Sequence, residues 1–478
     1  MLQLIQNKKR LLNYFFLGFV LFFLAHLVYT FFCVDIILQI SSILIDLIFI
    51  ALFTTAILNL NYAFLVSVLL LPVFFFMENA TIINQIYNSE SLAIASVYSL
   101  DPRIIGFCTV AFFSVLVIAE KKKKIFRQVP MLKIIIPAII VLSSSVIWSI
   151  AGQEKYVQMC FYILLLILYL VSFVSVKDVI SFYRLLGFFV MLSVPAVLMA
   201  YLQIFGGVFF EYADISIKRV SGPFNSPNLL GSFLLVVFAL IMIMLLAFNI
   251  KRYLKYRWLL ILYLILILPI FFLTFSRSAW IGIVVFSVIF SLHNKRFFAG
   301  AVLTFILLLS VMLVFETTRE RINGFSERTM FDSVYARTEI WRLSYKKFLE
   351  KPFLGYGAGS FSETINDAKE SAGGTDNPHN DIVFFAVEGG IIGVISFVSI
   401  IVAFYINLFK IQFITLRKKV HRTDGKIKWN ILSLGIIALF VATTVIGTLE
   451  SYYEGNFLHL FLWSVLGGWF ALAKRKMV

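Results

Sequence analysis

Charged residues are scarce in this sequence, and that scarcity excludes most classes of protein. Only 14% of the 478 residues are charged and 61% are hydrophobic, whereas an ordinary soluble domain carries roughly 25% charged residues. Intrinsic disorder is excluded as well, because a disordered chain has little hydrophobic surface and much charge. The mean hydropathy of +0.96 and the 53 phenylalanines require lipid as a solvent. The sequence therefore predicts a polytopic membrane protein.

Cysteine is also scarce, and its distribution excludes a disulfide scaffold. The three cysteines are Cys33, Cys108 and Cys160, scattered in or beside apolar segments without metal-ligand spacing. We expect three inert thiols. The formal net charge of +16 would suggest a nucleic-acid partner in a soluble protein. Here the basic residues flank apolar runs, so we expect them to orient the chain in a membrane and expect no nucleic-acid partner.

About fourteen apolar runs are long enough to cross the roughly 30 Å hydrocarbon layer of a bilayer. The first run follows three basic residues but lacks a small-residue cleavage site, so we expect a retained helix rather than a signal peptide. The predicted spans are 11–33, 36–58, 62–77, 104–119, 130–150, 158–176, 185–209, 228–249, 258–275, 279–293, 297–315, 380–409, 429–449 and 457–473.

Positive charge predicts the orientation of these spans, because Lys and Arg favour cytoplasmic connections. With the N-terminus in the cytoplasm, 26 of the 41 Lys and Arg residues fall on the cytoplasmic side and 14 on the outer side. Nine of those 14 lie in one long loop, which also carries ten Asp and Glu residues. We expect both termini to be cytoplasmic and this loop to be extracytoplasmic and partly helical.

These patterns divide the chain into four segments. The N-terminal transmembrane helices occupy residues 1–184, and transmembrane helices with outer-face arginine motifs occupy 185–315. The long extracytoplasmic loop is 316–379, and the C-terminal transmembrane helices occupy 380–478.

Within the long loop, residues 336–349 have the spacing of an amphipathic helix. This spacing puts four residues on one face, at i, i+4, i+8 and i+11, and Pro352 is expected to end the helix. The four residues are Arg337, Trp341, Tyr345 and Phe348.

Three arginines lie on the outer side, against the general charge bias. Arg219 precedes the span at 228–249, Arg277 occupies a very short connection, and Arg337 lies in the long loop. The planar guanidinium bonds phosphate oxygens in pairs and stays charged, which suits a pyrophosphate head group at the membrane surface. The alternative is that these side chains are interfacial anchors that reach lipid phosphate.

His379 is the only one of the five histidines in the long loop. A histidine at the water–lipid boundary can act as a general base, although it can also be a capping or interfacial residue. Glu388 lies nine residues later, about 180° around and ~13 Å along a continuous helix. We therefore expect Glu388 to fix helix packing rather than to pair with His379.

Glycines Gly355, Gly357 and Gly359 alternate in LGYGAGSF, which precedes His379. No predicted strand comes before them, so a nucleotide-binding loop is not expected. The glycines are expected to let the backbone pass close to a helix or a substrate.

Four groups of motifs, in this order, resemble the O-antigen ligase/polymerase superfamily, which includes Wzy-type polysaccharide polymerases and WaaL ligases. They are RVSGPFNSPNLLG, SRSAWIG, YARTEIW with KPFLGYGAGSF, and PHNDIVFFAVEGGIIG, within about residues 185–400. The resemblance implies an all-α, GT-C-like membrane glycosyltransferase that uses undecaprenyl-pyrophosphate-linked glycans. It implies neither a metal nor another cofactor.

The resemblance also implies roles for individual residues. Arg219 and Arg277 match the positions that bind pyrophosphate, and His379 matches the position that activates the acceptor hydroxyl. Arg337 matches a recurrent loop arginine, and we group it with the pyrophosphate-binding candidates. The expected supporting residues are Asn228, Asn380 and Glu388.

The length of the chain favours a polymerase that joins lipid-linked repeat units of a surface polysaccharide. The alternative is an O-antigen ligase that transfers the glycan to lipid A-core. A lipid-linked oligosaccharide flippase is an alternative of another class, but it is expected to show an internal repeat and a charged cavity, and neither is evident. Expected partners are the lipid-linked donor and acceptor, membrane lipids and a chain-length regulator. The expected location is the bacterial cytoplasmic membrane, with the site on its outer face.

Overall fold

The computed structural model is mainly helical in the residues that it describes, and no strand occurs among them. The only bridge is an isolated antiparallel pair between Phe248 and Ile427. All described residues belong to one compact unit, residues 74–478. They are 128–206, 219–224, 226–293, 329–366, 377–417, 427–451 and 457–477, with six single positions between 107 and 118.

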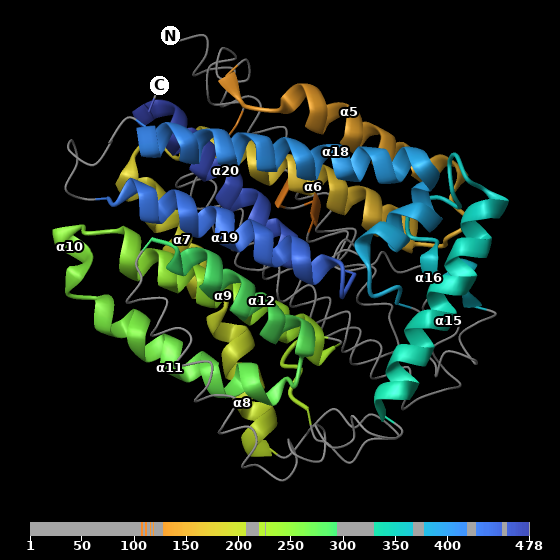
Figure 1. Cartoon of the computed structure of the whole chain (residues 1–478), viewed down its shortest axis with the longest axis horizontal. Helices are drawn as coiled ribbons and strands as arrows, with labels where there is room; N and C mark the ends of the chain where they lie inside the picture. Colours follow the sequence, from red (N-terminus) through yellow and green to blue (C-terminus); the bar gives the residue numbers. More distant parts are fainter. Residues whose placement is uncertain are drawn as a thin grey trace, which may run out of the picture. The chain divides into compact units, whose positions relative to one another are not determined.

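The helices carry the labels used in Figure 1. The first group is α5 (Leu132–Ser144), η2 (Ser145–Trp148), α6 (Glu154–Ser175), α7 (Val179–Leu192) and α8 (Val194–Gly206). The second is α9 (Pro227–Ala247), α10 (Lys251–Leu254), α11 (Arg257–Leu273) and α12 (Arg277–Ser291). The third is α15 (Thr329–Glu350), α16 (Phe361–Thr364), α18 (Asp381–Arg417), α19 (Trp429–Gly447) and α20 (Phe457–Met477).

Five helical segments of the described chain are both long enough and apolar enough to cross a membrane: α6, the α7–α8 run, α9, α18 and α19. Three shorter apolar helices accompany them, namely α5 with η2, α11 and α12. These helices and α20 coincide with predicted spans. The remaining predicted spans, 11–33, 36–58, 62–77, 104–119 and 297–315, lie outside the described residues or include only single described positions. The protein is thus a multi-pass helical membrane protein, while the count of about fourteen spans and the GT-C-like fold stay predictions.

Two predicted spans differ from the helices in a way that local chemistry explains. The span predicted at 185–209 starts earlier, at Val179, because Asp178 accepts from the Ser181 backbone and forms a capping box. The span predicted at 380–409 extends to Arg417 and is not continuous, because Gly390 has φ 59° and ψ −157°. The expectation of one continuous helix there is wrong at Gly390.

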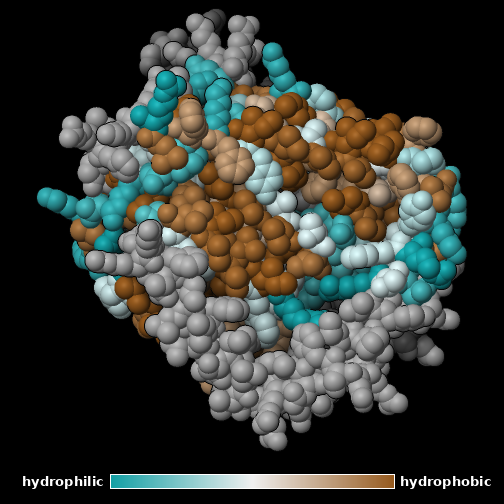
Figure 2. Space-filling view, viewed as in Figure 1, coloured by the Kyte–Doolittle hydropathy of each residue, from teal (hydrophilic) through white to brown (hydrophobic). Residues whose placement is uncertain are grey.

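The described helices run between two ends that match the two predicted sides. At one end, the backbone N–H of Lys428 donates to Ala247 (2.8 Å), and Lys474 donates to Gln128 (2.9 Å). At the other end lie the outer-face motifs, and α15 crosses the ends of the bundle there (Figure 1). Figure 2 shows a hydrophobic surface between hydrophilic regions at these two ends. The predicted alternation of connections therefore agrees with the fold.

The packed interior is rich in aromatic side chains drawn from four helices. Tyr169 of α6 meets Trp463 of α20 with ring centroids 6.3 Å apart, and Phe404 of α18 meets Phe440 of α19 at 5.5 Å. A Cβ on Gly467 would lie 2.2 Å from the Tyr169 carbonyl oxygen, so only glycine lets α20 approach α6 this closely.

Two of the three cysteines that were expected to be inert thiols, Cys108 and Cys160, are free and lie side by side. The side chains of Cys108 and Cys160 are hydrogen-bonded to each other. The neighbouring rings of Phe107 and Phe161 lie tilted against each other, with ring centroids 6.0 Å apart. Phe107 and Cys108 therefore pack directly on α6.

Candidate active site

Three helices begin at the end of the bundle that α15 crosses, which is the end predicted to face outward, and polar residues of the sequence motifs start each of them. Ser226 caps α9 by accepting from the Asn228 backbone, and Ser276 caps α12 by accepting from the Ala279 backbone. Asn380 caps α18, since its Oδ1 accepts from the backbone N–H of Ile382 at 2.8 Å. Helix N-termini carry partial positive charge, so this end of the bundle favours an anionic ligand.

Glu450, in the turn after α19, joins the candidate residues. Its Oε1 accepts from Asn228 Nδ2 at 2.8 Å and from Arg337 Nη2 at 3.1 Å. Its Oε2 lies 2.7 Å from Nδ1 of His379. The residue is 5% exposed, and a buried carboxylate is stable only when charges and hydrogen bonds compensate it. Glu450 is therefore the centre of a polar cluster, and the other members of this cluster are distant from it in the sequence.

His379 is held in one orientation by its backbone and by Glu450. Its φ of 50° is unusual for a residue other than glycine, and its backbone N–H donates to Asn377 Oδ1 at 2.8 Å. A carboxylate can only accept, so Nδ1 carries the proton in the bond to Glu450. Nε2 is then the nitrogen that can accept a proton from a substrate. Non-glycine residues with positive φ concentrate at functional sites, which agrees with this assignment.

Arg277 is the first residue of α12, and its side chain is exposed at the same end. Partial burial and the positive charge of Arg337 lower the pKa of Arg277, whereas the negative charge of Glu450 raises it. Arg277 is thus close enough to both residues to interact with their charges. Phe275, two residues earlier, has φ 50°, so a strained turn positions this arginine.

Arg219 joins the cluster from a buried position. It is 8% exposed, its Nε donates to the Thr274 carbonyl at 2.9 Å, and its Nη2 donates to Asn228 Oδ1 at 2.8 Å. Arg219 is therefore connected to Glu450 through Asn228. The structure brings the three predicted arginines and His379 together, with Arg277 more accessible than Arg219.

The glycine-rich loop and Glu388 support the cluster without joining it. The break of α18 at Gly390 leaves its backbone groups without helical partners, and the loop supplies them. Tyr356 and Gly357 donate to the carbonyls of Val387 (3.0 Å) and Glu388 (2.8 Å). In the other direction, Ile391 donates to the Pro352 carbonyl at 2.8 Å. The interpretation of the glycines as a close backbone passage is confirmed.

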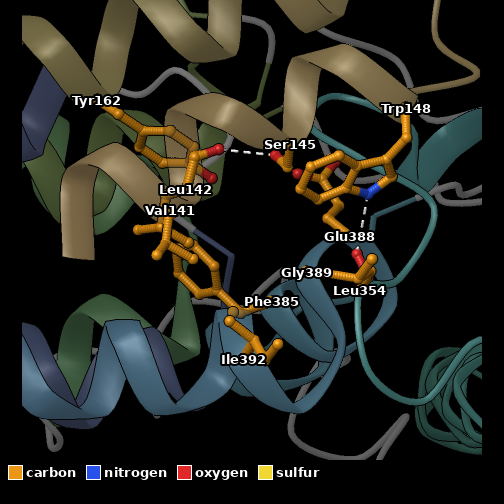
Figure 3. Close-up of a pocket in the computed structure, with 11 residues that line it drawn as sticks. Val141, Leu142, Ser145, Trp148, Tyr162, Leu354, Phe385, Glu388, Gly389 and Ile392 are labelled. Atoms are coloured by element: carbon orange, nitrogen blue, oxygen red, sulfur yellow. Dashed lines mark hydrogen bonds between the residues drawn. The ribbon is translucent and has the colours of Figure 1, made fainter. Parts of the chain in front are cut away.

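Glu388 itself faces this loop. Its Oε1 accepts from the Phe361 backbone at 3.2 Å, as expected for a residue that fixes packing. Figure 3 shows Glu388 in a small pocket beside Trp148 and Phe385, where Trp148 Nε1 donates to the Leu354 carbonyl at 3.1 Å. The carboxylate that pairs with His379 is Glu450 and not Glu388, in agreement with the sequence argument against Glu388.

The amphipathic helix predicted at 336–349 is present as part of the longer α15, which ends before Pro352. Its buried face differs from the expected one. Ile340 and Ser344 are buried, whereas Trp341 and Tyr345 are exposed. Trp341 Nε1 donates to the Pro378 carbonyl at 2.7 Å, which fixes α15 beside His379.

Sequence reasoning missed Glu450. The available signal was its position at the outer end of a predicted span, on the side where three arginines gather. Among the described residues, no group of three or more His, Cys, Asp and Glu side chains has the geometry of a metal site.

Comparison with known proteins agrees with the motifs. No curated protein is similar enough to match the chain. Residues 262–398 match the family model described as O-antigen ligase, a range that includes Arg277, Arg337, His379 and Glu388. The resemblance to the O-antigen ligase/polymerase superfamily is thereby confirmed, with residues 262–398 as the part of the chain that matches its family model.

Proposed function

We propose that the protein is a polysaccharide polymerase that joins undecaprenyl-pyrophosphate-linked glycans outside the cytoplasmic membrane. The donor glycan passes from its pyrophosphate lipid to a hydroxyl of an acceptor lipid-linked repeat unit, with inversion at the anomeric carbon. The single observation that carries the proposal is the cluster of arginines and His379 around Glu450 at the outer-face end.

His379 acts as the general base. A sugar hydroxyl is a poor nucleophile until its proton is removed, and Nε2 of His379 accepts that proton as the new glycosidic bond forms. Glu450 holds the ring through Nδ1 at 2.7 Å and stabilises the imidazolium that results, as the carboxylate of a catalytic triad does. The bond between the anomeric carbon and the pyrophosphate oxygen breaks in the same step.

The arginines stabilise the leaving pyrophosphate. Arg277, exposed at the start of α12, binds phosphate oxygens directly, and Arg337 contributes its positive charge beside it. Arg219 contributes through Asn228, which it holds against Glu450. Pyrophosphate leaves as a stable anion, so the leaving group needs no general acid. The site therefore needs no group beyond those that the chain supplies.

The alternative is an O-antigen ligase, which would use the same residues and a lipid A-core acceptor. The family match supports both reactions. The greater length of the chain favours the polymerase, because ligases of the family are usually shorter.

Purified protein in lipid nanodiscs tests this function. Incubated with lipid-linked repeat units, it is expected to give products of increased chain length, and incubated with lipid A-core as well, it is expected to leave that acceptor unmodified. His379→Ala should reduce turnover by about 10²–10⁴-fold while donor binding and melting temperature are kept. His293→Ala is the matched control, since His293 lies at the opposite end of α12. A well-folded His379→Ala protein with near wild-type turnover would contradict the mechanism.

A further inference from the structure

The exposed aromatic side chains of α15 have no role in the mechanism above. Trp341 is 42% exposed and Tyr345 is 64% exposed. Aromatic side chains of this size usually lie against the core of a protein. On the same helix, Ile340 and Ser344 are almost fully buried against the bundle. Helix α15 therefore keeps one packed face and presents aromatic rings beside it.

Helix geometry explains the gradual exposure of these side chains. Each step of four residues advances about 40° around a helix, so Arg337, Trp341 and Tyr345 turn progressively away from the packed face. Arg337, the first of the three, is 28% exposed and pairs with Glu450. The aromatic stripe, defined here as Trp341 and Tyr345, therefore begins one helical turn from the polar cluster and extends to about 12 Å beyond Arg337.

The Trp341 side chain is held in one position. A tryptophan that only anchors the protein at the membrane surface does not need such a fixed position. Trp341 Nε1 donates to the Pro378 carbonyl at 2.7 Å, the residue directly before His379. Because this ring is already ordered, it loses little conformational entropy when a ligand binds to it. It offers the ligand a flat apolar face with a polar edge. The same turn carries the ion pair of Glu339 and Arg342, with oxygen and nitrogen 2.8 Å apart, and the exposed Arg342 can donate hydrogen bonds to hydroxyl groups.

We infer that Trp341 and Tyr345 form a carbohydrate-binding platform on α15, on which sugar rings of the glycan stack while their anomeric end lies at the cluster of Arg277, Arg337 and His379. The inference rests on the proposed function. A pyranose ring has an apolar face of C–H bonds and a rim of hydroxyls, which complements an aromatic face flanked by charged groups. The stripe is continuous with the polar cluster through Arg337, so a glycan held at the pyrophosphate extends along it.

A membrane-interface anchor is the competing occupant, because Trp and Tyr are also enriched at the water–lipid boundary. The apolar side chains better suited to lipid lie further along the chain, at Leu349, Phe353 and Leu354, all exposed. These residues follow the stripe in the sequence, whereas Trp341 of the stripe is bonded to Pro378, the residue before His379. The stripe itself is therefore assigned to the glycan.

The test uses the full chain in nanodiscs and, as probe, the free oligosaccharide released from the lipid-linked repeat unit by mild acid. Binding is followed by tryptophan fluorescence and by calorimetry for wild type, Trp341→Phe, Trp341→Leu and Tyr345→Leu. Trp341→Leu and Tyr345→Leu are expected to weaken binding about tenfold or more, and Trp341→Phe less, because it keeps a ring. In turnover, KM for the lipid-linked substrate should rise by the same factor in Tyr345→Leu, while kcat of this variant stays near wild type. Trp258→Leu is the control, since Trp258 is also exposed, by 60%, and follows the basic connection at the other end of the bundle.

Unchanged oligosaccharide affinity in Trp341→Leu and Tyr345→Leu, with turnover intact, overturns the platform and leaves the proposed function standing. Quenching of Trp341 emission by brominated lipid, measured as wild type minus Trp341→Phe, also overturns it in favour of a membrane anchor. If the wild type forms no glycan product, the proposed function fails, and the oligosaccharide-binding comparison still decides whether the platform exists.

Discussion

At the scale of single residues, the candidate site depends on one carboxylate with three donors. Glu450 accepts from Asn228, Arg337 and His379, and Asn228 in turn accepts from Arg219. Arg219 and Arg337 were predictable, because arginines on the outer side contradict the charge rule and stand out in the sequence. The acceptor was not, because Glu450 and Glu454 both lie in the same outer connection and nothing in the spacing separates them. Only the fold shows which of the two meets His379.

Glu450→Gln is predicted to abolish most activity without unfolding the protein. Glutamine keeps the shape and the acceptor of the Nδ1 bond, but it removes the negative charge that stabilises the imidazolium, so kcat should fall by about 10²–10⁴-fold. Steady-state kinetics and melting temperature on the same preparation check this. The control is Glu339→Gln, which removes an exposed ion pair with Arg342 and should be nearly neutral. Wild-type kcat in Glu450→Gln would show that Glu450 only holds the fold together.

Arg277→Lys is predicted to lose activity although it keeps the charge. Lysine is a point charge without the planar fork that bonds two phosphate oxygens together, so turnover should fall at least about tenfold. Initial rates over a range of lipid-linked donor concentrations would measure the loss. Arg342→Lys is the matched control, because Arg342 lies on α15 with its side chain exposed and paired to Glu339. If both variants turn over at the wild-type rate, Arg277 does not bind pyrophosphate through its fork.

At the scale of helices, hydropathy predicted where the chain is helical but not where a helix breaks. The predicted span at 380–409 is apolar on both sides of Glu388 and the glycine pair at 389 and 390, so the pattern favours a continuous helix. The break at Gly390 is stable only because loop 352–357 pairs with the exposed backbone groups. That loop precedes the predicted span in the sequence by more than twenty residues. The hydropathy of the span alone therefore cannot show that the loop supplies hydrogen-bond partners to it.

Gly357→Ala is predicted to destabilise the protein by about 1–3 kcal/mol, because a left-handed backbone conformation is strained for a residue with a Cβ. Gly357 has φ 99°, and an added Cβ would lie 2.3 Å from Cα of Ser149. A lowered melting temperature, measured in detergent, is the expected result. Gly389→Ala is the control: an added Cβ there meets nothing within 4 Å, and alanine suits a helix better than glycine. Equal melting temperatures for the two variants would show that the loop does not support the break.

At the scale of the whole molecule, the pattern of positive charge predicted which connections share an end. The outer-face motifs at Arg219, Arg277 and His379 come from three separate connections, and they meet at Glu450. This agreement follows from physics, because a chain that crosses a membrane repeatedly must place alternate connections on the same side. Charge also predicts which of the two ends faces the cytoplasm, and the fold itself does not depend on that choice.

Cysteine labelling in intact cells tests this orientation. Two lysines with exposed side chains, Lys346 on α15 and Lys255 beside α10, are replaced one at a time by cysteine in a chain from which Cys33, Cys108 and Cys160 have been removed. A membrane-impermeant maleimide should label Lys346→Cys in intact cells and Lys255→Cys only after lysis, because Lys255 belongs to a basic connection that favours the cytoplasm. Labelling after lysis is the control for each variant, because the maleimide should then reach both cysteines. Labelling in the opposite order would place the cluster around Glu450 inside the cell, where it could not act on glycans already moved to the outer face.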